Sequence, residues 1–259
     1  MKIKAFHNVW LLRIVHWLSY LSIPIFLLYP ETFNLYAFLI GLICITMLGG
    51  SGGLHRYFSH KSFSTGKKRH WFLAFVTTLS TQGSIPLWTE MHRLHHAHSD
   101  TEDDPIAPSV IGLWRGFFAL QDDKHLERMS TKAIVKQLRD PAVLFFHNWY
   151  WPTIISYVVV ISLIDPSLIL TMYLCPVFLI RFMYGVQNTL GHGHPKIGYR
   201  NHDTKDNSRN STILNIITCF LGEALHNNHH ANPGKYHYSE KWYEIDPTGR
   251  IIKHLFAKS

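Results

Sequence analysis

Histidine is concentrated in this sequence in short motifs whose spacing repeats. The chain has 19 histidines among 259 residues, and the pattern HxxHH occurs twice, at His92–His96 and at His226–His230. Positions i, i+3 and i+4 of a helix lie on one face, about 5–6 Å apart, so each motif would present three imidazoles on one side of a helix. Imidazole is the commonest metal ligand in proteins. The two motifs therefore predict a metal site rather than two solvated basic helices.

Three further histidines and one asparagine add to this metal-binding potential. His55 and His60 are five residues apart and would diverge around a regular helix, so they can converge only if the helix bends or ends. The glycines of Gly49–Gly53 favour an irregular helix end just before them. Asn188 and His192 are one helical turn apart where an apolar stretch ends. An isolated histidine there would be an interfacial anchor, but beside the other motifs it supplies a ninth imidazole.

Eight or nine imidazoles exceed the four ligands of a tetrahedral zinc site and the six of an octahedral site, so two metal ions are implied. Imidazole binds iron, zinc, copper and nickel alike, so the spacing alone does not name the metal. Ligating histidines usually donate their other N–H to a carboxylate or carbonyl, which makes Asp104 and Glu223 candidates for that role. Asp100, Glu102 and Asp103 fit a solvated loop equally well.

Four apolar stretches approach the ~20 residues that a helix needs to cross a bilayer. The short connections inside the first and second pairs, Pro30–Phe33 and Asp165–Ser167, are acidic, and the basic residues fall on the opposite side, which the positive-inside tendency makes cytosolic. The expected spans are about residues 9–29, 34–50, 144–164 and 168–187.

These stretches predict an all-α membrane protein with four transmembrane helices in two hairpins and both termini in the cytosol. A cytosolic helical cap, about residues 51–143 and 188–259, would carry the metal site. Residues 71–88 are apolar but rich in hydroxyl groups, so we expect a helix at the interface or packed among the spans. The sequence contains no Gly/Ser linker or repeat, which favours a single integral-membrane domain over residues 1–259.

The net charge of +8 has two interpretations. Cytosolic loops of membrane proteins are basic because anionic headgroups attract them, and this explanation is sufficient by itself. An acidic acyl carrier, such as coenzyme A or an acyl carrier protein, is the more specific alternative. The three cysteines lie far apart in the sequence, so neither a disulfide framework nor a CxxC metal site is expected.

The histidine motifs, taken in order, resemble those of the membrane fatty acyl desaturases, the family of the stearoyl-CoA desaturases. His55–His60, His92–His96 and His226–His230 match the HxxxxH, HxxHH and HxxHH pattern, and the resemblance extends roughly from Phe38 to the C-terminus. The other matching elements are Asn188 with His192, DNSRN at Asp206–Asn210, GEALHNNHH at Gly222–His230, and IDPTG at Ile245–Gly249.

The resemblance implies a di-iron centre that uses O₂ to introduce a cis double bond into a saturated acyl chain. It implies no catalytic residue beyond that centre, because an unactivated C–H bond offers no acidic proton or leaving group. One iron would be bound by His55, His60, His92, His96 and His229. The other would be bound by His95, His192, His226 and His230, with Asn188 reaching it through a water molecule.

The resemblance also bears on substrates and partners. Trp88 would contact the substrate, whereas Glu90-Met91 stand where the acyl-CoA enzymes of the family have Arg-Asp, so the carrier could be coenzyme A or another acyl carrier. The sequence contains no HPGG heme motif, so we expect electrons from a separate donor of ferredoxin or cytochrome b5 type. The remaining expected partner is the lipid bilayer, and no nucleic acid is expected.

Two alternatives remain open at this stage. A membrane di-iron hydroxylase of alkyl, sterol or carotenoid substrates uses similar histidine motifs, and its product would carry a hydroxyl group rather than a double bond. A metal-binding or metal-transporting membrane protein is more remote, because transporters place ionisable ligands near the bilayer midplane and the proposed ligands lie outside the expected spans.

Overall fold

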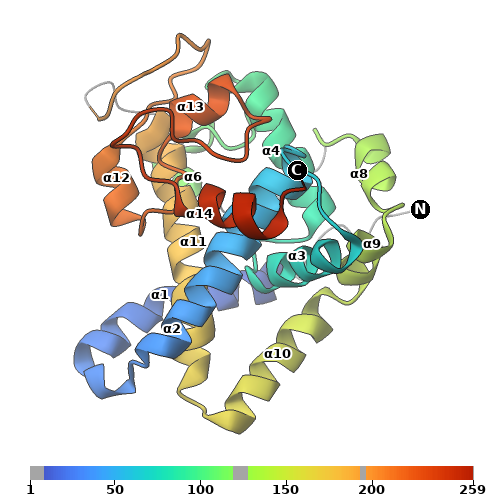
Figure 1. Ribbon diagram of the computed structural model, residues 1–259, viewed down its shortest axis with the longest axis vertical. Helices are drawn as coiled ribbons and strands as arrows, with labels where there is room; N and C mark the ends of the chain where they lie inside the picture. The colour runs from blue at the N-terminus through green and yellow to red at the C-terminus, as the bar shows by residue number, and fades with distance from the viewer. Residues whose placement is uncertain (1–8, 119–127, 193–196, 259) are drawn as a thin grey trace. The chain divides into compact units, whose positions relative to one another are not determined.

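The computed structural model describes residues 9–118, 128–192 and 197–258, and these residues are mainly helical (Figure 1). No β-strand is present in these ranges; two isolated antiparallel bridges join Tyr199 to Asn210 and Asn210 to Leu225. The expectation of an all-α protein is therefore confirmed at this level.

The chain divides into two compact units, each assembled from three separate segments. The apolar unit consists of Met1–Leu54, His70–Trp88 and Ser130–Arg181. The histidine unit consists of His55–Arg69, Thr89–Met129 and Phe182–Ser259. Every histidine singled out in the sequence belongs to the second unit.

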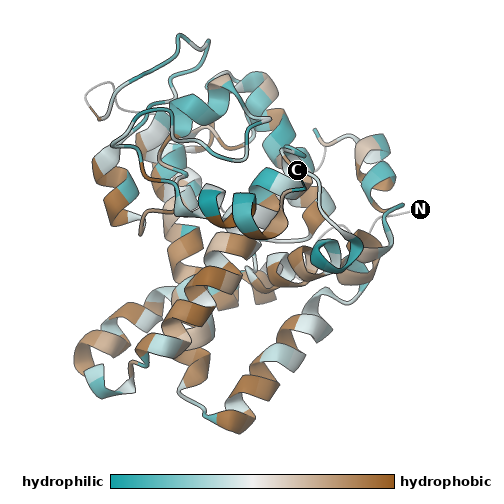
Figure 2. Cartoon of the chain, viewed as in Figure 1, coloured by the Kyte–Doolittle hydropathy of each residue, from teal (hydrophilic) through white to brown (hydrophobic). Residues whose placement is uncertain are grey.

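Long apolar helices dominate the apolar unit, as the hydropathy colouring of α1, α2 and α10 shows (Figure 2). Its buried cluster brings Leu12 of the first helix together with Tyr150, Ile154 and Val177. The helices of this unit are α1 (Val9–Leu28), η1 (Pro30–Thr32), α2 (Leu35–Gly41), α8 (Thr131–Gln137), α9 (Pro141–Asn148), α10 (Tyr150–Ile164) and η3 (Ile169–Leu174). Four more helices, η2 (Leu42–Ser59), α3 (Lys67–Leu79), α4 (Ile85–His98) and α11 (Cys175–Val186), lie partly or wholly in it.

Three helical segments of the described chain are long and apolar enough to cross a membrane: Trp10–Leu28, Leu35–Ser59 and Ile169–Gly191. The expected span at 144–164 is not one continuous helix in the structure, because the helix is interrupted at Trp149, which has φ −104° and ψ 27°. Asp140 caps α9 before this break, and α10 then has only 15 residues. Four spans are therefore not established by helix length alone.

The second of these segments runs further than the sequence suggested. Instead of ending at the glycines, η2 continues through them to Ser59 as a π-helix. A Cβ at Gly49 would lie 2.3 Å from the carbonyl oxygen of Val76, and one at Gly53 would lie 2.3 Å from Thr77 Oγ1. The glycines thus permit close approach of α3 within the apolar unit, and the expectation of a helix end there is wrong.

The hydroxyl-rich stretch at 71–88 is divided between two helices, with the break near Gly83 and Pro86 that these residues predict. α3 ends at Leu79 and α4 begins at Ile85, separated by a turn in which Thr81 has φ 56° and Gly83 has φ 101°. The polar side chains of this turn are buried within the apolar unit, where the Thr81 hydroxyl lies 2.7 Å from that of Tyr173. The turn is therefore packed among other helices, which is one of the two expectations for this stretch.

Shorter helices build the histidine unit around the C-terminal half of α4. Its other elements are α5 (Pro108–Ile111), α6 (Leu113–Phe118), η4 (Gln187–Gly191), α12 (Thr212–Ile217), α13 (His226–Ala231), α14 (Pro247–Ile251) and η5 (Ile252–Phe256). A small apolar cluster joins Val186, Leu214 and Ala224 and so ties the segment before η4 to α12 and to the loop before α13.

Candidate metal centre

Nine imidazoles of the histidine unit converge in two groups. Within each group the candidate ligand nitrogens all lie within 4.8 Å of one another. The five-histidine group contains His55, His60, His92, His96 and His229. The four-histidine group contains His95, His192, His226 and His230. These memberships are the same as those of the two ligand sets that the family resemblance implies.

Each HxxHH motif contributes to both groups, and the two motifs do so in opposite ways. In α4, the first and last histidines, His92 and His96, join the five-histidine group, and His95 joins the other group. In α13 the first and last histidines join the four-histidine group, and His229 joins the five-histidine group. The i+3 side chain diverges from the i and i+4 pair, so one short helix can bind two neighbouring ions.

His55 and His60 converge because the helix that carries them is π-helical. The backbone N–H of His60 donates to the carbonyl of His55 at 3.2 Å, a hydrogen bond between residues five apart. This i→i+5 pattern defines the π-helix, which recurs at functional sites. It brings the two ring centroids to 5.0 Å. η2 ends at Ser59, so the two histidines converge at the π-helical end of the helix, which is later in the chain than the glycines.

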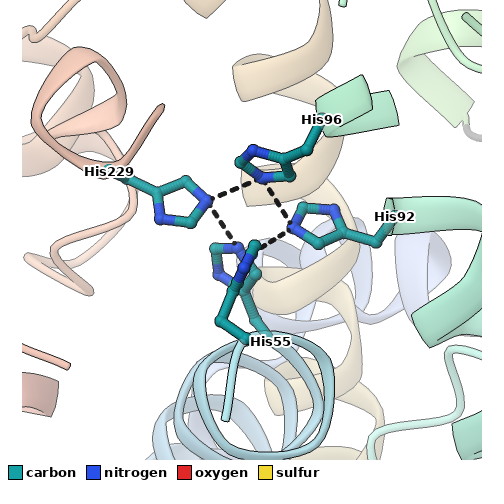
Figure 3. Close-up of side chains that lie close together, drawn as sticks. His55, His92, His96 and His229 are labelled. Carbon is teal, nitrogen blue, oxygen red and sulfur yellow. Dashed lines mark hydrogen bonds between the residues drawn. The ribbon is translucent and has the colours of Figure 1, made fainter. Parts of the chain in front are cut away.

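The Nε2 atoms of the five-histidine group point toward one another (Figure 3). His229 Nε2 lies 3.0 Å from Nε2 of both His55 and His96. His92 Nε2 lies 2.8 Å from that of His60 and 3.1 Å from that of His96. An imidazole nitrogen carries one hydrogen or one lone pair, so it cannot form two such hydrogen bonds at once.

A shared cation accounts for these contacts better than hydrogen bonds do. Two nitrogens bound at right angles to one metal at about 2.1 Å lie about 3.0 Å apart. In the four-histidine group, His192 Nε2 lies 2.8 Å from His226 Nε2, and the buried Nε2 of His230 has no hydrogen-bond partner in the described ranges. Both groups therefore fit first-row transition metals that accept nitrogen ligands, iron included.

Carboxylates hold the opposite ring nitrogen, Nδ1, of four of these histidines. Such a contact fixes the tautomer, so that Nδ1 donates and Nε2 keeps its lone pair for a metal. The Nδ1–carboxylate distances are 2.6 Å for His55 with Glu223, 2.9 Å for His95 with Asp104, 3.1 Å for His192 with Asp100 and 2.8 Å for His230 with Asp206.

Two of these carboxylates were expected and two were not. Asp104 and Glu223 occupy the role that the sequence suggested for them. For Asp100 the sequence favours a solvated loop equally, and it marks Asp206 only as part of the DNSRN match to the family. Asp206 stands far from any histidine motif in sequence, so only the family resemblance could have drawn attention to it.

A fully buried arginine connects the first histidine motif to the segment before the third. The Arg56 guanidinium donates from Nε and Nη2 to Glu223 Oε1, at 3.2 and 3.0 Å. It also donates from Nη1 to both oxygens of Asp246, at 3.0 and 2.8 Å, and from Nη2 to the carbonyl of Leu221. Its charge also lies 4.0 Å from the centroid of the Tyr238 ring. Arg56 therefore orients the carboxylate that orients His55.

Two buried asparagines fix α13, which has only six residues. Asn228 Nδ2 donates to the Tyr238 carbonyl and to Glu244 Oε2, and Asn228 Oδ1 accepts from Asn210 Nδ2. Asn227 Oδ1 accepts from the backbone N–H of Asn201 and of His202. The two residues between the histidines of HNNHH thus attach the motif to the surrounding loops.

Burial keeps most of these imidazoles neutral. Burial, together with the smaller effect of neighbouring imidazoles such as that of His55, lowers the pKa of His60 to about 2. The same two causes, burial first, lower the pKa of His92, His96, His226, His229 and His230. Burial alone would raise the pKa of Asp206, but its hydrogen bond with His230 holds that pKa below the usual range. Neutral imidazole is the form that binds a metal.

Asn188 and Trp88 lie outside these contacts. The half-buried Asn188 amide donates to the Gly116 carbonyl at 3.4 Å and belongs to neither histidine group. Trp88 is buried on α4, one turn before His92, and belongs to the apolar unit. Their predicted roles, a water-mediated iron contact and a substrate contact, stay predictions.

Comparison with known proteins gives a consistent result. The family model described as fatty acid desaturase matches residues 33–259. The chain is 31% identical over 221 residues to a probable acyl-CoA desaturase of Schizosaccharomyces pombe, an alignment that covers 79% of this chain and 43% of the yeast protein. This chain thus spans less than half the length of that relative.

Two bacterial relatives are covered more fully. The sn-1 stearoyl-lipid 9-desaturase of Synechocystis sp. is 29% identical, over 87% of this chain and 71% of its own length. A hex-5-enoyl-[acyl-carrier protein] acetylenase of Moorena producens is also 29% identical, over 84% of this chain and 73% of its own length. The histidine groups and these matches agree, and the chain belongs to the fatty acid desaturase family of oxidoreductases that act on fatty acyl chains.

Proposed function

We propose that this protein is an O₂-dependent desaturase that introduces a cis double bond into a saturated fatty acyl chain at a histidine-ligated di-iron centre. The convergence of nine imidazoles in two adjoining groups carries this proposal. His55, His60, His92, His96 and His229 would hold one iron, and His95, His192, His226 and His230 the other.

When bound, the two irons would supply the activation of O₂ and the removal of hydrogen from two adjacent methylene groups. The residues of this chain would bind, orient and exclude water, in the division of labour usual for cofactor enzymes. The carboxylates at Nδ1 of His55, His95, His192 and His230 would keep Nε2 of these four histidines free of protons, and no nucleophile or general base is required. Asn188 would contact the second iron through a water molecule, and Trp88 would contact the acyl chain.

The acyl carrier and the electron donor are further parts of the proposal. Relatives of this chain are named for substrates on coenzyme A, on lipids and on acyl carrier protein. The substrate here would be a fatty acyl chain on coenzyme A or on one of these other carriers. A separate protein of ferredoxin or cytochrome b5 type would deliver the electrons.

We also propose a multi-pass membrane topology with four spans in two hairpins, both termini and the metal centre facing the cytosol. Three candidate spans support it, together with the apolar α10 as a short fourth. A single domain over residues 1–259 is supported by continuity, because η2, α4 and α11 each run from one compact unit into the other.

The test is product analysis in a desaturase-deficient microbial host by gas chromatography–mass spectrometry. The native chain should yield a new monounsaturated acid, and His229→Ala and His95→Ala should abolish it. His98→Ala is the matched control, because His98 lies on α4 with His95 but is exposed and belongs to neither group. A hydroxylated lipid would replace the desaturase proposal with the hydroxylase alternative.

Metal analysis of the purified protein provides the second test. About two irons per chain are expected from the two ligand sets. A protein that forms no new product with coenzyme A, lipid or acyl carrier protein substrates and a reducing system, and that contains no iron, would refute the proposal.

A further inference from the structure

Carboxylates are distributed unequally between the two histidine groups. In the four-histidine group, three of the four imidazoles face a carboxylate through Nδ1: His95 with Asp104, His192 with Asp100 and His230 with Asp206. No Lys or Arg within the described ranges forms an ion pair with any of these three carboxylates. This group therefore has three carboxylates against its ligands, none of them in an ion pair with Lys or Arg in the described ranges. The neighbouring guanidinium of Arg200 donates to the backbone carbonyls of Thr204 and Asp206 and not to the Asp206 carboxylate.

The five-histidine group is close to neutral by comparison. Of its imidazoles, His55 alone contacts a carboxylate within the described residues, that of Glu223. The same carboxylate accepts hydrogen bonds from Arg56, whose guanidinium is fully buried and offsets the charge locally. Asp246 shares Arg56 but contacts none of the ligand histidines. Glu223, Asp246 and Arg56 together have a net charge of about −1 beside the five-histidine group. The carboxylates of Asp100, Asp104 and Asp206 amount to about −3 beside the four-histidine group.

The distribution of charge matters because these groups are buried. Glu223, Asp104 and Arg56 are at most 3% exposed, and Asp100 and Asp206 are 16% and 12% exposed, so water screens the first three weakly and the last two only in part. Charge around a buried metal, and hydrogen bonds to its ligands, set its reduction potential. A hydrogen bond from Nδ1 to a carboxylate also raises the basicity of the imidazole. Both effects stabilise a ferric ion relative to a ferrous ion.

We propose that the two iron positions have different reduction potentials, with the ferric state favoured in the four-histidine group and the five-histidine position reduced first. This inference rests on the proposed di-iron centre. The first electron supplied converts the ferric ion in the five-histidine group to the ferrous state, and the second electron does the same in the four-histidine group. Asp100, Asp104 and Asp206 are positioning residues in this scheme, and Arg56 keeps Glu223 from having the same effect on the other side.

The test is a reductive titration of ⁵⁷Fe-loaded protein with dithionite, followed by electron paramagnetic resonance and Mössbauer spectroscopy. The measured quantity is the maximum yield of the mixed-valent, one-electron-reduced form, which gives the comproportionation constant. Asp206→Asn and Asp100→Asn keep an oxygen that can accept the Nδ1 hydrogen but remove the charge. Each should lower this constant at least tenfold, equivalent to about 59 mV.

Glu223→Gln removes a negative charge beside the five-histidine group. It should raise the reduction potential of that position, which is already the higher of the two, and so increase the comproportionation constant and the mixed-valent yield. Asp203→Asn is the control, since Asp203 is exposed in the same loop as Asp206 and should leave the constant unchanged. Equal shifts of the same sign for Asp206→Asn and Glu223→Gln, or no shift in either, would overturn the inference.

These outcomes are separate from those that test the proposed function. A protein with two irons and desaturase product but no charge-dependent difference between the positions would refute only the unequal potentials. Absence of iron from the purified native protein would refute both proposals. Iron content is measured for every variant first, and Asp100→Asn replaces Asp206→Asn should that variant fold poorly.

Discussion

The two HxxHH motifs have the same spacing but are held in place differently. His92–His96 lies on α4, a helix of 14 residues in which Arg93, between the ligands, is exposed. His226–His230 lies on α13, a helix of six residues in which Asn227 and Asn228 are buried and hydrogen-bonded to the surrounding loops. Helices this short are not stable alone. The first motif thus depends on a continuous helix and the second on tertiary hydrogen bonds.

The largest effect should come from replacing the histidine at the fourth position of each HxxHH motif. His95→Ala and His229→Ala remove ligands from different groups, so each should reduce iron from about two to about one per chain and abolish desaturation. In the double variant both irons should be lost. Metal analysis and product analysis check this, with His98→Ala expected to behave as the native chain. Loss of both irons in either single variant would mean that the two positions bind metal only together.

Acid should destabilise the metal-free protein through the same imidazoles. The fold holds the pKa of His60 near 2, whereas it is about 6.5 in the unfolded chain. The unfolded state therefore binds the proton first, and stability is lost as the pH falls from about 6.5 toward 2. Each such histidine contributes a loss of about 1.4 kcal/mol per pH unit.

Histidines of both groups should contribute to this loss. Burial lowers the pKa of His92, His96 and His229 in the five-histidine group and of His226 and His230 in the four-histidine group. Unfolding measured at pH 7.5, 6.5 and 5.5 should show falling stability, and His60→Gln should reduce the slope. A free energy of unfolding that does not change with pH below 6.5 would contradict the buried, neutral imidazoles.

Replacing Arg56 should destabilise the segment before the second HxxHH motif. Arg56→Met leaves Glu223 and Asp246 buried without their cation, and breaking a buried ion pair in this way costs about 3–5 kcal/mol. Denaturant unfolding in detergent measures the change. Lys235→Gln is the control, because Lys235 is exposed and its ion pair with Glu240 should contribute less than about 1 kcal/mol. Equal losses in the two variants would show that the Arg56 network is not a stabilising element.

The smallest expected effect, that of Asn228→Ala, tests directly whether the two HxxHH motifs are held in place differently. Asn228→Ala removes hydrogen bonds that hold α13 and leaves buried partners unsatisfied, at a cost of about 1–3 kcal/mol. It should also lower metal affinity about 10–100-fold. Leu94→Ala alters the same motif position in α4 and should leave metal affinity unchanged, since the continuous helix still positions His95. Similar metal affinities in the two variants, measured by competition with a chelator, would remove the distinction between the motifs.

Local pattern was sufficient for part of the structure. The helix that carries His92–His96 follows from the i, i+3, i+4 spacing and is confirmed by α4. The break between α3 and α4 follows from Gly83 and Pro86, since glycine adopts the positive φ seen there and proline is tolerated in a first helical turn. Asp104 was identified as a partner because it follows the motif closely in sequence.

Other features depended on contacts between distant segments. The π-helical course of η2 was not foreseen, because glycines that usually end a helix are here required by the approach of Val76 and Thr77. Composition alone predicts one continuous apolar helix at 144–164, whereas the structure interrupts it at Trp149. Asp206 and Arg56 were missed since their partners, His230 and Glu223, are remote in sequence.

The sequence by itself determined the chemistry available to this protein, because the histidine motifs and the apolar segments of near-membrane length are visible without coordinates. The tertiary structure decided how that chemistry is arranged. It divided each HxxHH motif between two groups, gave one group three carboxylates that have no Lys or Arg partner in the described ranges, and gave the other an arginine-neutralised carboxylate. The physical reason is that side-chain type and helical period are local properties, whereas burial and charge neutralisation depend on which distant segments pack together.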